Sequence, residues 1–397
     1  MASHMEDHLI SKIKLMSHIY LGTVFSGIGA PEQALKKLGV SYEVVFACDN
    51  GEREPKLDDK SFREIIDSTS KDCREEKIRS IYKEVGENRM EISYKTNYDI
   101  DSNYFYQDIR FLNGQDFKGK LDLLVGGSPC QAFSSNGKRG GFEDTRGTLF
   151  YEYARIIKEA QPKSFIFENV KGMLTHDSRR TWQTIKNVFA ELNYTVYIHK
   201  DENGAESPVL NACDYGVPQN RVRIYVVGIR NDIEHKPFEF PKPFKLEKYV
   251  PDFLEDKVDA SYYLGQKGFE FVTTHPNRAK VGSFDMTGKD GNSGWIMNCQ
   301  KANQQFNWNG DFIFEDLSDK HTQEILNKAY VGIWQGRKGV IRKFTPRECL
   351  RLMGFPEDFI QSVDNNTMYR QCGNSMVVDV MAYLIQEIIN TGALDKK

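Results

Sequence analysis

The sequence lacks several features that would assign a protein quickly to a class. No apolar stretch among its 397 residues is long enough to cross a bilayer, and the N-terminal part has no secretory pattern. Its seven cysteines include no CxxC pair and no Cys/His spacing typical of a metal site, so we expect neither a disulfide framework nor a bound metal. These absences favour a cytoplasmic protein with reduced thiols that does not act at a membrane.

A strong net charge is also absent. The net charge of −3 argues against a uniformly basic coat, although an acidic back can mask a local cationic cleft for nucleic acid. The chain has the composition of a globular protein, and its length suffices for one large domain or two moderate ones. We expect residues 1–5, MASHM, to be a remnant of an expression vector.

Strand-like and helix-like segments alternate along the first half of the chain. Helical patterns are found at 148–160 and 181–193, for example. Apolar runs predict strands at 20–25, 42–49, 121–127, 164–170 and 223–229. Such alternation implies right-handed crossovers, so we predict an α/β fold with a mostly parallel sheet and helices on both faces.

Two segments interrupt this alternation. Residues 51–104 are charge-rich and largely helical, which predicts an insertion; a solvated helical pair is the favoured interpretation, and a contact with DNA or another partner is the alternative. Residues 232–335 lose the strand–helix pattern and predict a second, smaller and irregular domain. We therefore expect a main domain at 17–231, the second domain at 232–335, and a C-terminal segment at 336–394 that returns to the main domain.

A glycine turn, FSGIGA, follows the first predicted strand at 25–30. Gly27 and Gly29 lie between a strand and a helix, and Asp49 ends the next strand, where a carboxylate can bind ribose hydroxyls. The third glycine of the phosphate-cradling GxGxxG motif is absent. The pattern therefore favours an adenosine ligand without a pyrophosphate, such as S-adenosylmethionine, over NAD; a tight packing turn is the alternative.

Cys130 lies in GGSPCQAFSS (126–135), directly after a predicted buried strand. A free cysteine often packs as a small apolar residue, but a loop at the C-terminal edge of a parallel sheet is also where α/β enzymes keep their active sites. Glu168 ends the strand FIFENV and is expected at the same edge, as a used carboxylate or as a structural ion pair.

Basic residues supply two further candidates. Arg221 and Arg223 are two positions apart in QNRVRIYVVG, so in an extended chain they point the same way and suit phosphate or base recognition; a solvated strand end is the alternative. The loop SSNGKRGGF (134–142) combines glycines with Lys138 and Arg139. It is expected to close over an anionic substrate, or else to be a surface turn.

Taken in order, these motifs resemble those of the DNA (cytosine-5) methyltransferase family in its small bacterial restriction–modification form. The resemblance is carried by FSGIGA, GGSPCQAFSSNGKRGGFEDTRGTLF, FENV, QNRVRIYVVG, FTPRECLRLMGFP and QCGNSMVV, and fails only in 51–104 and 232–335. It implies a Rossmann-like S-adenosylmethionine-dependent methyltransferase domain with a mostly parallel sheet. It also implies that the smaller irregular domain recognises the DNA target.

The resemblance implies roles for the candidate residues. Cys130 would add to carbon 6 of a flipped cytosine, and Glu168 would hold or supply a proton at ring nitrogen 3. Arg223 would contact the base, and Arg221 the DNA backbone near it. The implied cofactor residues are Phe25, Gly27, Ile28, Gly29, Asp49, Asn50, Asp108, Ile109, Pro129, Leu149, Asn374 and Ser375. The implied DNA contacts are Ser134, Asn136, Lys138, Arg139 and, in the gap left by the base, Asn292.

Two positions depart from the family pattern. Thr23 stands where an acid is common, and Asn50 where a bulky apolar residue faces the adenine. Both departures concern cofactor affinity and leave the catalytic set intact.

The expected partner is double-stranded DNA, bound by a monomer that has a cognate restriction endonuclease in the same system. Three alternatives remain open. The tRNA-directed branch of the family shares the Pro-Cys and Glu-Asn-Val chemistry, but a large second domain suits a reader of base edges in DNA. A catalytically silent DNA-binding regulator would not need Cys130, Glu168 and both arginines, and a dehydrogenase would have no use for the Pro-Cys loop.

Overall fold

The computed structural model describes residues 18–128, 149–274, 294–302 and 310–395. They form two compact units, which we describe separately. The first unit takes its residues from Met1–Leu210, Arg223–Pro241 and Met381–Lys397, and the second from Asn211–Val222 and Lys242–Val380.

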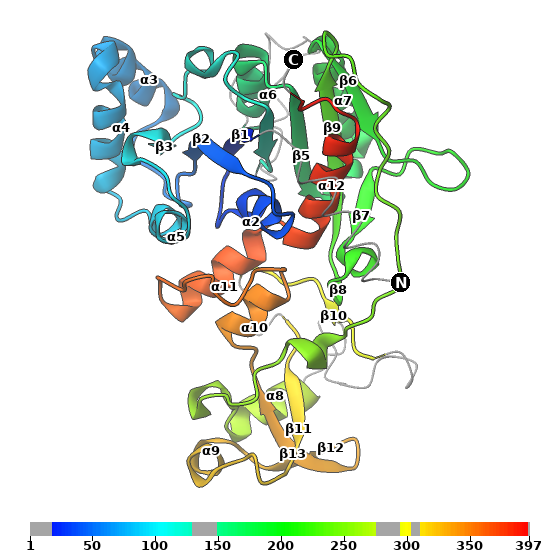
Figure 1. Ribbon diagram of the computed structural model, residues 1–397. Coiled ribbons are helices and arrows are strands. Elements are labelled where there is room, and N and C mark those ends of the chain that lie inside the picture. The colour runs from blue at the N-terminus through cyan, green and yellow to red at the C-terminus, as the bar shows by residue number, and fades with distance from the viewer. Residues whose placement is uncertain (1–17, 129–148, 275–293, 303–309, 396–397) are drawn as a thin grey trace. The chain divides into compact units, whose positions relative to one another are not determined.

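A mixed β-sheet, in which five neighbouring strands are parallel, organises the first unit (Figure 1). The strand order is β3-β2-β1-β4-β5-β9-β6, and β7 also pairs with β9. The first five strands in this order are parallel, whereas β9 runs antiparallel to both β5 and β6. The strands are β1 (Ile19–Val24), β2 (Tyr42–Cys48), β3 (Phe105–Tyr106), β4 (Leu123–Gly126), β5 (Ser164–Val170), β6 (Tyr194–Ile198), β7 (Val209–Asn211) and β9 (Val222–Arg230). The predicted mostly parallel α/β fold is confirmed.

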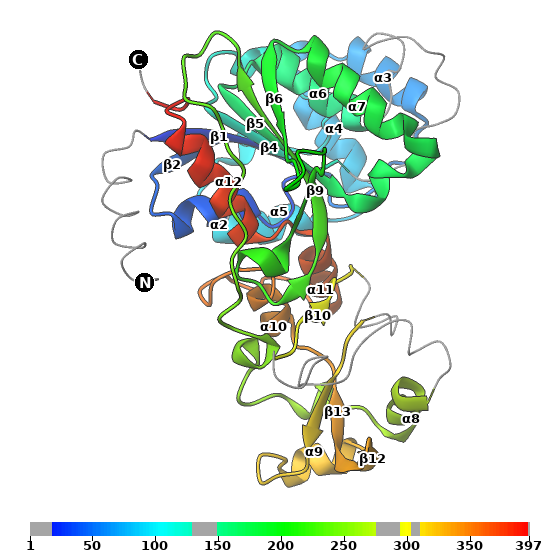
Figure 2. The same cartoon turned by 90° about the vertical axis from the view of Figure 1, so that its right-hand side faces the viewer.

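Helices cover both faces of this sheet. Figure 2 shows α6 and α7 on one side and α2 and α12 on the other. They are α2 (Ala30–Lys37), α6 (Leu149–Ala160), α7 (Arg180–Glu191) and α12 (Val378–Asn390). Aromatic rings fill the layer under α6 and α7; Phe165 of β5 stacks on Phe189 of α7 with ring centroids 5.1 Å apart. Strands buried on both faces account for the continuous apolar runs in the sequence.

The segment between β2 and β3 is a small helical unit with a core of its own. It contains α3 (Asp59–Ser68), α4 (Arg74–Lys83) and α5 (Arg89–Asn97). Helices α3 and α4 pack against each other through buried side chains, namely Phe62, Ile66, Ile78, Ile81 and Tyr82. The two predicted helices of the insertion are present as α3 and α4, whereas α5 has too weak an apolar stripe for the sequence to have indicated it.

The second unit combines short strands and helices. β8 (Gln219–Asn220) pairs with β10 (Met297–Asn298), and β13 (Arg337–Arg342) lies between β11 (Ile313–Asp316) and β12 (Gly332–Trp334). Its helices are α8 (Gln266–Thr274), α9 (Gln323–Lys328), α10 (Pro346–Arg351) and α11 (Asn365–Asn374). This unit also holds residues 336–380 of the C-terminal segment, 336–394, that the sequence predicts to return to the main domain, whereas the residues from Met381 on belong to the first unit. The domain assignment by function stays a prediction.

No helix in the described part of the chain is both long enough and apolar enough to cross a membrane.

Candidate cofactor and catalytic site

The glycine turn after β1 has the strand–turn–helix context that the sequence predicted. Phe25, Gly27 and Gly29 adopt φ values of 53°, 55° and 78°, in the left-handed region that favours glycine. A Cβ at Gly29 would overlap the ring of Tyr98, whereas one at Gly27 would meet no atom closer than the Phe25 carbonyl oxygen at 4.0 Å. The turn is therefore closed on the Gly29 side and open at Gly27, as a loop that lies against a ligand would be.

Asp49, at the end of β2, ties this turn to the next one. Its carboxylate accepts the Gly27 amide at 2.9 Å through Oδ2 and the Gly51 amide at 2.8 Å through Oδ1. Desolvation raises the pKa of Asp49 above its ordinary value, and the two amide bonds act in the opposite direction. Each carboxylate oxygen has further acceptor capacity, so Asp49 can still bind hydroxyl groups such as those of a ribose. Asn50 uses its amide within its own turn, accepting from Glu52 and donating to Arg53.

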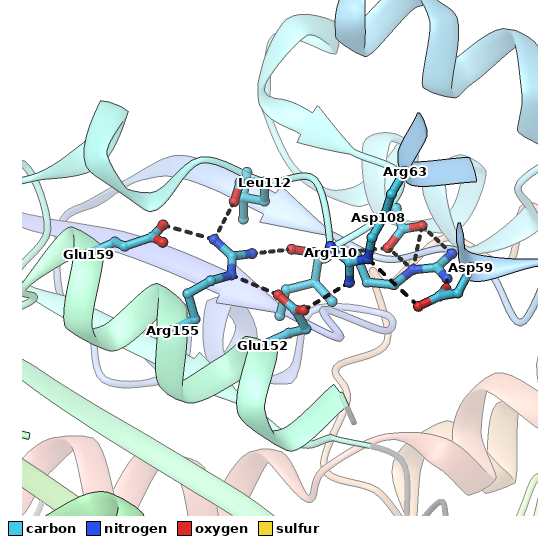
Figure 3. Close-up of polar contacts among 9 residues, drawn as sticks. Asp59, Arg63, Asp108, Arg110, Leu112, Glu152, Arg155 and Glu159 are labelled. Atoms are coloured by element: carbon cyan, nitrogen blue, oxygen red, sulfur yellow. Dashed lines mark hydrogen bonds and ion pairs between the residues drawn. The ribbon is translucent and has the colours of Figure 1, made fainter. Parts of the chain in front are cut away.

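Asp108, after β3, accepts more side-chain hydrogen bonds than the other predicted cofactor residues in the described part of the chain (Figure 3). The guanidinium of Arg110 donates to both carboxylate oxygens at 2.6–3.0 Å, and the Tyr82 hydroxyl donates to Oδ2 at 2.7 Å. The Arg110 amide also donates to Oδ1 at 3.0 Å. These donors fill the acceptor sites of the carboxylate. The geometry therefore favours Asp108 as a support of its loop over the predicted contact with the cofactor.

The remaining predicted cofactor residues fall in both units. Ile109 is buried, and its carbonyl accepts from Arg155 of α6 at 2.7 Å. Ile28 is buried within the glycine turn, and Leu149 is the partly buried first residue of α6. Asn374 and Ser375, at the end of α11, belong to the second unit.

Glu168 and Arg223 form an ion pair between adjacent strands of the first unit. Arg223 Nε lies 3.3 Å from Glu168 Oε1. Both side chains are mostly buried, with 15% of the Arg223 side chain and 13% of the Glu168 side chain exposed. The antiparallel register places Glu168 opposite Tyr225, so Arg223 is its diagonal neighbour on the same face. The two predicted catalytic residues are therefore brought together.

Asn169, which we had not singled out, links β5 to the Pro-Cys segment. It is 2% exposed, and its amide donates to the Ser128 carbonyl at 2.8 Å, two residues before Cys130. Its own Oδ1 accepts the Val170 amide at 2.8 Å. A buried asparagine is rarely tolerated without such bonds, so its place in FENV was a signal that sequence reasoning could have used.

Arg221 has a different environment from Arg223, since it precedes β9 and is 3% exposed in the second unit. Its guanidinium donates to the carbonyls of Gln300 at 2.8 Å, Gly373 at 3.0 Å and Ser375 at 2.6 Å. These bonds join three separate chain segments. The geometry favours a structural role for Arg221 over the predicted contact with the DNA backbone.

Several predicted site residues lie outside the described residues. They are Pro129, Cys130, Ser134, Asn136, Lys138, Arg139 and Asn292. Within the described ranges, no group of three or more His, Cys, Asp or Glu side chains is placed to hold a metal ion.

Comparisons with known proteins identify the family of the chain. The sequence profile of C-5 cytosine-specific DNA methylases matches residues 73–390. The chain is 41% identical to the type II methyltransferase M.SsoII of Shigella sonnei over 276 residues, which are 68% of this chain and 64% of that protein. It is 36% identical to the type II methyltransferase M.HhaI of Haemophilus parahaemolyticus over 273 residues, which are 67% of this chain and 75% of that protein.

A solved structure supports the fold. The crystal structure of S. pombe Dnmt2 methyltransferase aligns with a TM-score of 0.58 over 92% of this chain and 97% of that one, at 18% identity. At this identity the likeness bears on the fold alone. The profile match spans more than half of the chain, and the M.HhaI match spans three quarters of that relative, so the chain belongs to the family of C-5 cytosine-specific DNA methylases.

Proposed function

We propose that this protein is a sequence-specific DNA methyltransferase that transfers a methyl group to carbon 5 of cytosine. The observation that carries the proposal is the Glu168–Arg223 ion pair, with Asn169 beside it holding Ser128. A carboxylate and a guanidinium, both mostly buried, lie next to the segment that leads into Cys130. This combination fits covalent chemistry on a base.

The cofactor of this family is S-adenosylmethionine, which supplies an electrophilic sulfonium methyl group when bound. The described residues fit an adenosine-containing ligand: a glycine turn open at Gly27, and a carboxylate at Asp49 on the next strand. Phe25 and Leu149 are partly buried and provide apolar surface around them, whereas Ile28 is fully buried within the turn. Asp108 shapes the adjacent loop through Arg110. Asn374 and Ser375 stay proposed cofactor residues on the strength of the family resemblance.

In the proposed mechanism, the Cys130 thiolate forms a bond to carbon 6 of the cytosine. The ring electrons shift toward nitrogen 3, where Glu168 holds the proton, and Arg223 keeps that carboxylate in place. Carbon 5 of the resulting enamine would take the methyl group that bound S-adenosylmethionine supplies, and the methyl–sulfur bond would break to leave S-adenosylhomocysteine. A base then removes the carbon 5 proton, the carbon–sulfur bond breaks, and the ring double bond is restored.

A stacked cytosine cannot reach such a site, so the base is extruded from the duplex. We propose that Ser134, Asn136, Lys138 and Arg139 contact the DNA around it, and that the 232–335 domain reads the target, with Asn292 in the space left by the base. The protein is proposed to act as a cytoplasmic monomer and to protect DNA against a cognate restriction endonuclease.

DNA that contains 5-fluorocytosine tests the proposal. Fluorine at carbon 5 blocks the final elimination, so the enzyme remains bonded to its target. The protein is incubated with S-adenosylmethionine and a random-sequence duplex of this kind, then denatured and resolved by gel electrophoresis. We expect a covalent adduct that Cys130→Ser abolishes, and sequencing of the trapped DNA gives the recognition site.

Two results would contradict the proposal. An adduct with 5-fluorocytosine tRNA but none with DNA would assign the protein to the RNA-directed branch. Tight DNA binding with no adduct on either substrate would indicate a silent regulator.

A further inference from the structure

The helical insertion at 51–104 contacts the loops proposed to bind the cofactor. Three of its tyrosines are buried, and each donates a hydrogen bond to a different part of that edge of the sheet: Tyr82, Tyr94 and Tyr98. A solvated helical pair would not bury these side chains.

Tyr98, directly after α5, supports the glycine turn. Its hydroxyl lies 2.9 Å from the Ile28 carbonyl and 2.8 Å from the Gly29 carbonyl, and its ring occupies the space that a Cβ at Gly29 would need. The turn holds Phe25, which is not a glycine, at a positive φ, a conformation that is costly unless neighbouring groups fix it. Tyr98 is such a neighbour.

Tyr94, inside α5, supports the same turn through a chain of hydrogen bonds. Its hydroxyl donates to Glu32 in the first turn of α2, and Glu32 also accepts from Thr23 at 3.3 Å. Thr23 in turn lies 2.8 Å from the hydroxyl of Ser26. Thr23 is the position where the family commonly has an acid. In this chain Thr23 instead bonds to the carboxyl group of Glu32, which also accepts from Tyr94.

Asn88, the N-cap of α5, attaches the insertion to the loop after β2. Its amide donates to the Asp49 carbonyl at 2.8 Å and to Gln107 at 3.0 Å, while its oxygen caps α5. The insertion therefore contacts Asp49, whose carboxylate accepts the Gly27 amide of the glycine turn.

Charged groups attach the insertion at a second place (Figure 3). Asp59, at the start of α3, pairs with Arg110, whose guanidinium also holds Asp108. Arg63 lies 3.4 Å from Glu152 in the first turn of α6. The insertion is thus connected to the loops after β1, β2 and β3 and to the helix that follows the Pro-Cys segment.

We infer that the insertion is a brace for the cofactor pocket, with Tyr94 and Tyr98 as positioning residues that set affinity for S-adenosylmethionine. A turn that is held in its binding conformation before the ligand arrives loses less entropy on binding. The inference rests on the proposed function, since it assigns these tyrosines to the same pocket.

The test compares Tyr94→Phe and Tyr98→Phe, each of which removes one hydroxyl and keeps the ring. Tyr104→Phe is the matched control, because Tyr104 belongs to the same insertion but is 49% exposed. The dissociation constant of S-adenosylhomocysteine is measured by titration calorimetry, and KM values are measured for S-adenosylmethionine and DNA. We expect each test variant to weaken cofactor binding about fivefold to tenfold, with KM for DNA unchanged and Tyr104→Phe like the wild type.

A melting curve without ligand accompanies each variant. Unchanged cofactor affinity in both test variants, or an equal rise in the KM values for cofactor and DNA, would overturn the inference even if the melting temperature falls. Failure of the proposed function would look different, because the wild-type protein would then form no covalent adduct with 5-fluorocytosine DNA, whatever its affinity for S-adenosylhomocysteine.

Discussion

Glu32 shows how one residue can make the stability of this protein depend on pH. It is fully buried, with Oε1 bonded to Tyr94 and Thr23, and Oε2 has no hydrogen-bond partner in the described part of the chain. Burial raises the pKa of Glu32 to about 7, and the nearby charge of Lys36 opposes the shift only weakly. The folded protein therefore keeps this carboxyl protonated at a pH where an unfolded chain does not.

We predict that Glu32→Gln removes this pH dependence. Between about pH 4 and 7 the unfolded chain loses the Glu32 proton while the folded chain keeps it, so the wild-type free energy of unfolding falls as the pH rises through this window. The difference between wild type and variant should therefore shift by roughly 3 kcal/mol in favour of the variant. Urea denaturation at several pH values measures it, and a difference that does not change with pH would contradict the assignment.

Glu168 gives a second prediction at the residue scale. Glu168→Gln keeps the size of the side chain but cannot hold a proton at cytosine nitrogen 3, so the methyl-transfer rate should fall about 10²–10⁴-fold. Binding of S-adenosylhomocysteine should stay at the wild-type level, since the cofactor residues are unchanged. Single-turnover kinetics and calorimetry make the comparison, and a loss of cofactor binding would indicate a structural role for Glu168.

At the scale of elements, the helix caps of the insertion differ in what they hold. Asp58 caps α3 on the surface by accepting the Ser61 amide at 3.0 Å. Asn88 caps α5 in a buried place and also donates to Asp49 and Gln107. The N-cap of α3 thus bonds only within its own helix, whereas the N-cap of α5 also joins that helix to the loops after β2 and β3.

We predict that Asp58→Ala lowers the free energy of unfolding only slightly, because the cap that it removes is exposed to solvent. Asn88→Ala should lower it by about 2 kcal/mol or more, because it also removes the donor to the Asp49 carbonyl and one of two donors to Gln107 Oε1. Cofactor affinity should fall with Asn88→Ala only. Chemical denaturation measures the free energies of unfolding, and calorimetry measures the cofactor affinity. An equal loss of unfolding free energy in the two variants would show that Asn88 acts only as a cap.

At the scale of the whole molecule, a net charge of −3 means that DNA binding must depend on local cations. Log affinity for DNA falls with log salt by about 0.9 for each phosphate contacted. The double variant Lys138→Ala, Arg139→Ala should therefore reduce the salt slope by about 1.8 if both side chains contact phosphates. Fluorescence anisotropy between low and high salt measures the slope, and an unchanged slope would place these residues away from the backbone.

Much of the first unit follows from local sequence. The apolar runs that became β1, β2, β4, β5 and β9 are long enough and rich enough in β-branched residues to be recognised, and the glycine turn identifies the loop after β1. The motifs around Cys130 and Glu168 indicate the family because residue type and order carry that information. Helix α5 was missed because its apolar stripe is weak, and its tyrosines are buried by contacts with distant residues.

The sequence by itself determined the fold class, the family and the identity of the catalytic candidates, since these depend on periodicity and on short motifs. Only the tertiary structure decided how the candidates are used. Arg221 and Arg223 are two positions apart, yet one binds three carbonyls and the other pairs with Glu168. The role of the insertion was likewise open, because Tyr94 and Tyr98 bond to residues that are 62 and 69 positions away in the chain. Long-range hydrogen bonds of this kind leave no periodic pattern in the chain.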